Sequence, residues 1–189
     1  ELAEGLENYN RAIHEGYDSD EMMFFMGMAY EHMDDDDMAL RYYQKACIKN
    51  PMRPDYMIKK ISAWIRLGKF DRAQEAAEEL LLKSPETFEG YHIKTQLLLI
   101  REKHEEAVTF AKAALERFPE DVELLCDYAK ALALAKRDEE ALRLINSAEK
   151  MKYFDQARYP LALLEGKIWA QSGQSDRAIQ TFKRCLELE

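Results

Sequence analysis

The sequence predicts an all-α fold, a solenoid of about eleven helices arranged in antiparallel pairs, and three observations lead to this prediction. Motifs recur at intervals of 34 residues, a period typical of stacked helical repeats. The 189 residues include only 7 glycines and 5 prolines, too few for the many tight turns of an all-β fold. The chain is 47% hydrophobic and 33% charged, a balance that favours folding in water over disorder or membrane insertion.

Three prolines end the first three complete repeats. Pro51, Pro85 and Pro119 are separated from one another by 34 residues. Small residues lie twelve positions before these prolines, at Ala39, Ala73 and Ala107. Bulky residues lie 21 positions before them, at Tyr30, Trp64 and Leu98. Because small residues in fixed phase let two helices approach closely, the pattern predicts a pair of packed amphipathic helices in each repeat.

The repeat period divides residues 1–189 into a single array. Extrapolation towards the start of the chain makes residues 1–19 the second helix of a preceding repeat. The complete repeats that follow span residues 20–53, 54–87, 88–121, 122–158 and 159–189.

The last two repeats depart from the strict period. Ala141 and Ala178 are 37 residues apart, so three residues have been inserted between them. We expect a longer loop or an extended helix near residues 153–158. Pro160 is expected near the start of the following helix, where its missing N–H loses no hydrogen bond.

Local signals indicate where the helices begin and end. Gly68 and Gly173 fall where first helices should end, and glycine readily takes the left-handed conformation of a helix C-terminus. Acidic residues fall at the start of the second helices, where they complement the helix dipole; these are Asp71, Glu105, Glu139 and Asp176. The four aspartates at residues 34–37 lie in the same kind of turn, and we expect them to cap a helix. They do not match a calcium loop, because the sixth and twelfth positions are Ala39 and Lys45.

The first helix of the first complete repeat carries a degenerate W-x2-L-G-x2-Y pattern, in the form of Met23, Met26, Gly27 and Tyr30. With the 34-residue period, the alanines of the second helices and the closing prolines, nearly the whole chain resembles the tetratricopeptide repeat (TPR) family. The resemblance implies a right-handed superhelix whose concave groove is lined by the first helices. It also implies a non-catalytic scaffold that binds a peptide or a protein segment in that groove.

The resemblance further assigns groove positions at fixed distances from the Leu-Gly pair of the motif. The groove residues that we expect to contact a ligand are Phe24, Met28, His32, Ile58, Ser62, Ile65, Arg66, His92, Gln96, Leu99, Lys130 and Leu134. Glu31 occupies an equivalent position. This surface is apolar with isolated polar groups, and it would suit an amphipathic helix or an extended peptide with hydrophobic anchors.

Phe24 has two possible roles. The segment from Met22 to Tyr30 is apolar on all sides, as expected of a helix that is buried all round. Phe24 and Met28 could therefore pack against a preceding helix instead of a ligand, and the sequence leaves both alternatives open for Phe24.

The charge of the chain argues against a nucleic-acid partner. The formal net charge is −9 and the pI is about 5.1, whereas proteins that grip phosphate backbones are usually basic. Binding of single-stranded RNA, which related helical repeats perform, is therefore a disfavoured alternative. No apolar run approaches the ~18 residues of a membrane span, so we expect no membrane contact.

Cysteine, histidine and glycine patterns give no support for an enzyme. Cys47, Cys126 and Cys185 form no CxxC pair, so we expect neither a disulfide nor zinc and infer a reducing, cytoplasmic location. The sequence has no HExxH motif, no GxSxG motif and no glycine-rich phosphate loop. We therefore expect no catalytic residues, no metal and no cofactor.

Self-assembly is the main alternative to ligand binding. Neither end of the repeat array shows an obviously polar cap, and stacked repeats need such caps to shield their last apolar face. The chain is therefore expected to be part of a longer protein or to form a homo-oligomer through its uncapped ends. Trp64 and Trp169 share the phase of Tyr30 and are expected to pack in the core.

Overall fold

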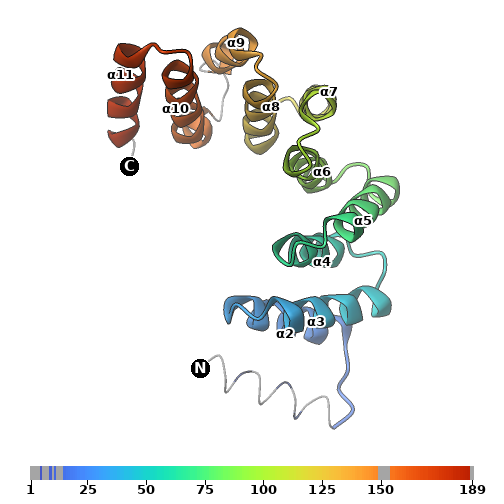
Figure 1. The fold of residues 1–189 in the computed structure, drawn as a ribbon. Helices are drawn as coiled ribbons and strands as arrows, with labels where there is room; N and C mark the ends of the chain where they lie inside the picture. Colours follow the sequence, from blue (N-terminus) through green and yellow to red (C-terminus); the bar gives the residue numbers. More distant parts are fainter. Residues whose placement is uncertain (1–4, 6–8, 10, 12–14, 149–153, 188–189) are drawn as a thin grey trace. The chain divides into compact units, whose positions relative to one another are not determined.

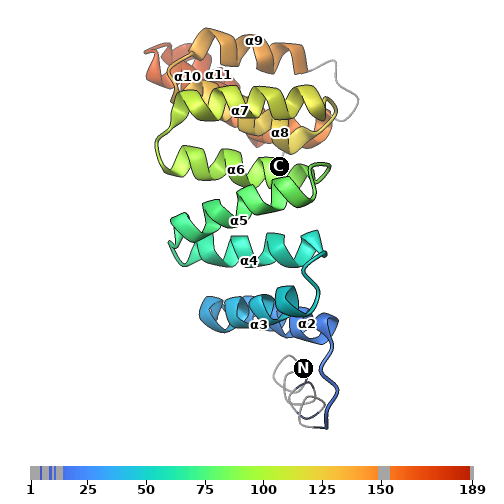
Figure 2. The same cartoon turned by 90° about the vertical axis from the view of Figure 1, so that its right-hand side faces the viewer.

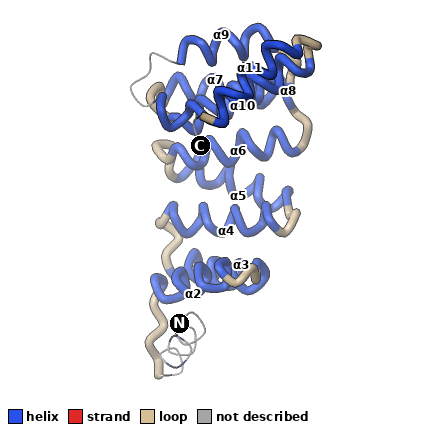
Figure 3. The backbone as a smooth tube through the Cα atoms, turned by 90° about the vertical axis from the view of Figure 1, so that its left-hand side faces the viewer, coloured by secondary structure: helices blue, strands red, loops and turns tan. Residues whose placement is uncertain are grey.

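A computed structural model describes residues 5, 9, 11, 15–148 and 154–187 of the chain. These residues contain ten helices and no strand, which confirms the all-α prediction (Figure 3). The second helix expected within residues 1–19 lies largely outside the described residues. The chain divides into two compact units, residues 1–93 and 94–189, with the division inside helix α6. Each unit is described by itself.

Unit 1 contains two complete helix pairs (Figure 1). The first pair is α2 (Asp20–His32) and α3 (Asp36–Lys49), and the second is α4 (Pro54–Arg66) and α5 (Phe70–Lys83). Helix α3 also packs against α4, which links the two pairs. Helix α6 (Phe88–Ile100) begins in this unit.

Unit 2 contains the later helices (Figures 1 and 2). They are α7 (His104–Arg117), α8 (Val122–Leu134), α9 (Asp138–Ala148), α10 (Phe154–Gln171) and α11 (Ser175–Leu186). Helix α10 packs against both α8 and α9 and then against α11. The core of this unit includes buried side chains from α8 to α10, among them Leu125, Leu132, Ile145, Leu161 and Ile168.

Side-chain caps set the beginning of three helices. Ser19 accepts a hydrogen bond from the Met22 amide at 3.0 Å, and Asp35 accepts one from the Met38 amide at 3.0 Å. Asp121 caps α8 in the same way. The aspartate run therefore supplies the N-cap and the acidic first turn of α3, as predicted.

The turn between the two helices of a pair has the same backbone geometry in each of the five pairs that the structure describes. One residue in each turn has a left-handed φ, namely Asp34 (57°), Gly68 (68°), Glu102 (57°), Lys136 (63°) and Gly173 (76°). The next residue donates its amide to the carbonyl five positions back, as Lys69 does to Trp64 at 2.8 Å. The prediction for Gly68 and Gly173 is confirmed, and three turns adopt this conformation without glycine.

Glycine at these three turns should stabilise the protein. A non-glycine residue in the left-handed region costs roughly 1–2 kcal/mol, offset in part by the greater freedom of glycine in the unfolded chain. We expect Glu102→Gly and Lys136→Gly each to raise the free energy of unfolding by about 0.5–1 kcal/mol in urea titrations. Gly68→Ala should lower the free energy of unfolding by a similar amount. If all three variants had the same free energy of unfolding, this account of the turns would be wrong.

Helix α10 differs from the prediction for Pro160. The helix spans 18 residues from Phe154 to Gln171, so Pro160 lies in its seventh position instead of near its start. The inserted residues thus extend the helix towards its N-terminus, which was one of the two alternatives, and Pro160 removes one backbone hydrogen bond from its interior. Residues 149–153 lie outside the described residues.

Two glycines allow the helices of a pair to touch. A Cβ atom on Gly27 would lie 2.5 Å from the ring of Tyr43, and one on Gly166 would lie 2.4 Å from the ring of Phe182. Both distances are far below van der Waals contact. The glycine of the repeat motif is therefore required by an aromatic ring from the second helix.

The tryptophans differ in their burial. Trp64 is 9% exposed and lies in the core of unit 1, as predicted. Trp169, at the equivalent position of the last pair, is only half-buried.

Candidate functional site

A pocket of about 320 Å³ lies in unit 1 between the first helices of two consecutive pairs. We call it the Glu31 pocket. Its lining residues are Met28, Glu31, His32, Asp34, Asp36, Lys59 and Arg66.

Three elements position these side chains. Helix α2 contributes Met28, Glu31 and His32 from its last turns, and α4 contributes Lys59 and Arg66. The left-handed turn that ends α2 brings the first residue of α3, Asp36, to the edge of the pocket. Side chains from two different repeats thus meet at one site.

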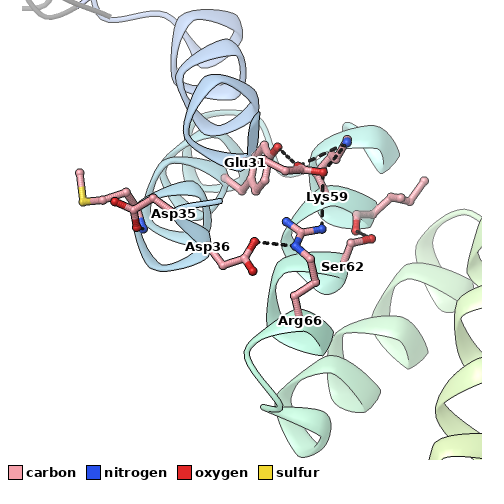
Figure 4. Close-up of polar contacts among 9 residues, drawn as sticks. Glu31, Asp35, Asp36, Lys59, Ser62 and Arg66 are labelled. Carbon is pink, nitrogen blue, oxygen red and sulfur yellow. Dashed lines mark hydrogen bonds and ion pairs between the residues drawn. The ribbon is translucent and has the colours of Figure 1, made fainter. Parts of the chain in front are cut away.

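Glu31 is the centre of a charged network (Figure 4). Its Oε1 atom lies 3.1 Å from Lys59 Nζ and 3.4 Å from an Arg66 guanidinium nitrogen. The Tyr43 hydroxyl donates a short hydrogen bond to Oε2. Arg66 also pairs through Nε with Asp36 Oδ1 at 2.5 Å. Both acids and both bases are therefore held in place before any ligand arrives.

The network sets the ionisation of its members. Burial by itself would raise the pKa of the Glu31 carboxyl, but the hydrogen bonds from Tyr43 and Lys59 and the positive charge of Arg66 outweigh burial and lower it. Burial, together with the hydrogen bond to Glu31, raises the pKa of Tyr43. At neutral pH the carboxyl is therefore an anion and the phenol is neutral.

This arrangement predicts a loss of stability in acid. Because the folded pKa of Glu31 lies below its ordinary value of 4.5, the carboxylate stabilises the fold fully above that value. This contribution is lost as the pH falls through the lower folded pKa. Urea titrations between about pH 7 and about pH 3 measure how the free energy of unfolding changes with pH. We expect this free energy to fall less in acid for Glu31→Gln than for the wild type, because glutamine cannot be protonated in this range. The same pH dependence of the free energy of unfolding in the two proteins would contradict the lowered pKa of Glu31.

The pocket can bind polar and charged groups of either sign. Lys59 and Arg66 offer donors, while Asp34 and Asp36 at its edge offer carboxylate acceptors. The Met28 side chain is half-buried and supplies an adaptable apolar surface. Within the described residues, no group of three His, Cys, Asp or Glu side chains is placed to hold a metal ion.

Three of the predicted groove residues of unit 1 meet in this pocket. Met28, His32 and Arg66 all line it, and the His32 side chain is exposed. Ile58 and Ile65 are half-buried on α4. The Ser62 hydroxyl donates to the Ile58 carbonyl at 3.0 Å, so its donor is already used within the helix.

Phe24 packs against neighbouring aromatic rings. Its ring is stacked on Tyr56 of the next pair with centroids 4.7 Å apart, and it lies 5.7 Å from the ring of Tyr43. The packing alternative for Phe24 therefore has direct contacts to support it, and the partners that the structure describes include rings of the following helices α3 and α4.

The remaining predicted groove residues have varied surroundings. His92, in unit 1, and Gln96, in unit 2, are half-buried. Lys130 is exposed, and Leu134, 40% exposed, lines an open pocket of about 480 Å³ within unit 2. Leu99 differs from the others because it is only 8% exposed and belongs to the hydrophobic core of unit 2. Its side chain packs inside the unit, which leaves little of it for a ligand.

Sequence reasoning missed four contributors to the Glu31 pocket. Lys59 follows a predicted groove position by one residue, and Asp34 and Asp36 were assigned only to the turn and cap. Tyr43 comes from α3, the second helix of the first pair, and its ring lies against Gly27. The glycine of the repeat motif was the only sign in the sequence that a large side chain approaches α2 at this point.

The cysteines are consistent with a structural role. Cys47, Cys126 and Cys185 form no disulfide within the described residues. Burial raises the pKa of Cys47, and burial together with nearby acids raises the pKa of Cys126 to about 11. Among the described helices, none is both long enough and apolar enough to cross a membrane.

Comparison with known families gives one match over nearly the whole chain. Residues 3–186 match the family model described as "Psidin, N-terminal TPR repeats region". No curated protein sequence matches the chain.

Solved structures share the fold at low sequence identity. A TPR protein from Parabacteroides merdae is 18% identical with a TM-score of 0.76, covering 99% of this chain and 72% of its own. MamA from Desulfovibrio magneticus RS-1 is 17% identical with a TM-score of 0.71, covering 90% and 95%. YrrB, described as a TPR protein with an unusual peptide-binding site, is 15% identical with a TM-score of 0.64, covering 97% and 93%.

Proposed function

Because the chain belongs to the family of Psidin N-terminal TPR repeat regions, we propose that it is a non-catalytic scaffold that binds a peptide or protein segment, with the Glu31 pocket as a contact site. The observation that carries the proposal is the meeting of Met28, His32 and Arg66 in one open pocket. The resemblance to the TPR family had assigned these three residues to the ligand-binding face.

The pocket suits a peptide because its polar groups are already oriented. Lys59 and Arg66 are anchored by Glu31 and Asp36, so a ligand need not order these flexible side chains on binding. Main-chain carbonyl and amide groups of a peptide could use the exposed edges of these ion pairs. The net charge of −9 supports a protein ligand over a nucleic acid. YrrB supports the same class of ligand by its description.

A double variant tests the proposal. Met28→Ala combined with His32→Ala removes an apolar contact and an exposed imidazole from the pocket while leaving the ion pairs intact. We expect affinity for a captured protein partner to fall about tenfold, the effect of losing one moderate hot spot. Partner capture with the intact protein, followed by titration calorimetry on the wild type and the variant, measures this change.

Two controls make the result interpretable. Arg41→Ala and Glu75→Ala change exposed residues of the second helices α3 and α5, outside the Glu31 pocket. Both should retain full affinity, and all variants should keep the wild-type melting temperature. A partner that binds the double variant as tightly as the wild type would place the ligand elsewhere on the protein.

A further inference from the structure

The charges that line the Glu31 pocket do not balance. The pocket has three carboxylates, Glu31, Asp34 and Asp36, but only one lysine and one arginine, Lys59 and Arg66. Both of these cations are already engaged. Lys59 Nζ lies 3.1 Å and 3.4 Å from the two Glu31 carboxylate oxygens. Arg66 pairs with Glu31 and with Asp36. The charge that remains for a ligand is therefore negative.

The four aspartates at residues 34–37 have different roles in the structure. Asp35 caps α3 and points away from the ion pairs of the pocket (Figure 4). Asp37 is not part of the lining, and it forms an ion pair with a lysine of the next helix pair at 3.6 Å. Asp34 and Asp36 line the pocket. Of the four, only these two are placed to meet a ligand there.

Asp34 and Asp36 still have unused carboxylate oxygens. The Asp34 side chain is exposed and makes no hydrogen bond or ion pair with any residue that the structure describes. Asp36 uses Oδ1 for Arg66 at 2.5 Å, and its Oδ2 atom has no partner within the same part of the chain. Ionised carboxylate oxygens only accept hydrogen bonds, and they bind ammonium and guanidinium groups most strongly. The edge of the pocket therefore suits a cationic group and disfavours an anion.

The surroundings of the pocket have the same sign of charge. Residues 1–93, which make up unit 1, include 19 acidic and 11 basic residues, a formal charge of −8. The whole chain has a net charge of −9, so unit 2 is nearly neutral. The field of unit 1 attracts a basic segment towards the Glu31 pocket and repels an acidic one.

We propose, building on the function proposed above, that the Glu31 pocket binds a basic peptide segment, with a Lys or Arg side chain against Asp34 and Asp36 and an apolar side chain against Met28. The cationic group donates to the unused carboxylate oxygens, so the ion pairs around Glu31 stay in place. The half-buried Met28 side chain provides an adaptable apolar surface for the neighbouring side chain. Asp34 is then the residue that selects a basic ligand over an acidic or uncharged one.

The repeat turns provide variants that change the charge at position 34 and keep its backbone. Asp34 has a left-handed φ of 57°, and Lys136 has one of 63° at the equivalent position of the turn between α8 and α9. Asp34→Lys therefore reverses the charge with a residue that the chain itself uses in this conformation. Asp34→Asn removes the charge, and asparagine also tolerates the left-handed region. Glu102→Gln is the matched control, because it removes one negative charge from the same turn position outside the Glu31 pocket.

A random library of short peptides with blocked ends is the probe. We expect peptides enriched on the wild-type protein to carry Lys or Arg beside an apolar residue. Titration calorimetry then compares one enriched peptide among the variants. It should bind Asp34→Asn about fivefold more weakly than the wild type, the upper range for a partly exposed ion pair, and Asp34→Lys more weakly still. Glu102→Gln should keep the wild-type affinity, and added salt should reduce the difference between the wild type and Asp34→Asn.

Three results would overturn the basic ligand. They are enrichment of acidic or uncharged peptides, equal affinity of the wild type and Asp34→Asn, and an equal loss in Glu102→Gln. The Met28→Ala and His32→Ala double variant distinguishes this failure from failure of the proposed function. If the double variant loses affinity and the Asp34 variants do not, the pocket is the contact site but its ligand is not basic. If no variant loses affinity, or no peptide is enriched, both proposals are wrong. Circular dichroism of each variant separates these results from a loss of folding.

Discussion

Replacing Gly27 with alanine should lower the free energy of unfolding by about 2 kcal/mol. The new Cβ would lie 2.5 Å from the Tyr43 ring, and such overpacking typically costs 1–3 kcal/mol. The ring cannot move aside easily, since Phe24 packs on it and its hydroxyl is bonded to Glu31. We therefore place the steric cost near 3 kcal/mol, offset by the ~1 kcal/mol that alanine gains over glycine in a helix.

Gly90→Ala is the matched control for this prediction. There the nearest contact would be 3.0 Å to a terminal methyl group of Leu81, which rotation can relieve. We expect a neutral or stabilising effect in the same urea titration. A second test combines Gly27→Ala with Tyr43→Leu, which removes the ring and should give a smaller loss than the sum of the single changes. Equal effects of alanine at Gly27 and Gly90 would mean that contact with the ring does not limit position 27.

Tyr56→Ala should be more destabilising still, by about 3–4 kcal/mol. Tyr56 is completely buried, its ring is stacked on Phe24, and its hydroxyl donates to Asp20 at 3.2 Å. Loss of a large buried aromatic side chain leaves a cavity that typically costs 3–5 kcal/mol. The contacts join α4 to α2, so the change should loosen both helix pairs of unit 1. Calorimetric melting and the urea midpoint measure the loss.

Tyr56→Phe separates the ring from the hydroxyl. It keeps the stacking and removes only the hydrogen bond, so we expect a cost of about 1 kcal/mol. Asp20 keeps its other partner, Asn50, at 2.9 Å. If phenylalanine were as costly as alanine, the hydroxyl and not the packing would be the main link between α2 and α4.

The repeat period was sufficient to predict most of the fold. Helix α2 begins at Asp20, where the first complete repeat was expected to begin, because the positions of prolines and small residues report the packing of each helix pair. The start of α10 was harder to predict. A proline often marks the beginning of a helix, but here the helix extends six residues before Pro160 and packs against α8 and α9.

The candidate site could be predicted only in part. The groove positions implied by the TPR resemblance include Met28, His32 and Arg66, and the structure brings these three side chains together in the Glu31 pocket. Phase alone could not reveal that Lys59 reaches Glu31 or that Arg66 reaches Asp36, because these pairs depend on how two repeats pack. It also misjudged the availability of Leu99, whose burial results from packing within unit 2.

The uniform turn between paired helices bears on how such chains diverge during evolution. The backbone alone closes this turn, and aspartate, glycine, glutamate and lysine all occupy its left-handed position. Selection can therefore change the charge at these five tips independently, at a modest cost in folding energy. New surface chemistry can arise there while the architecture persists.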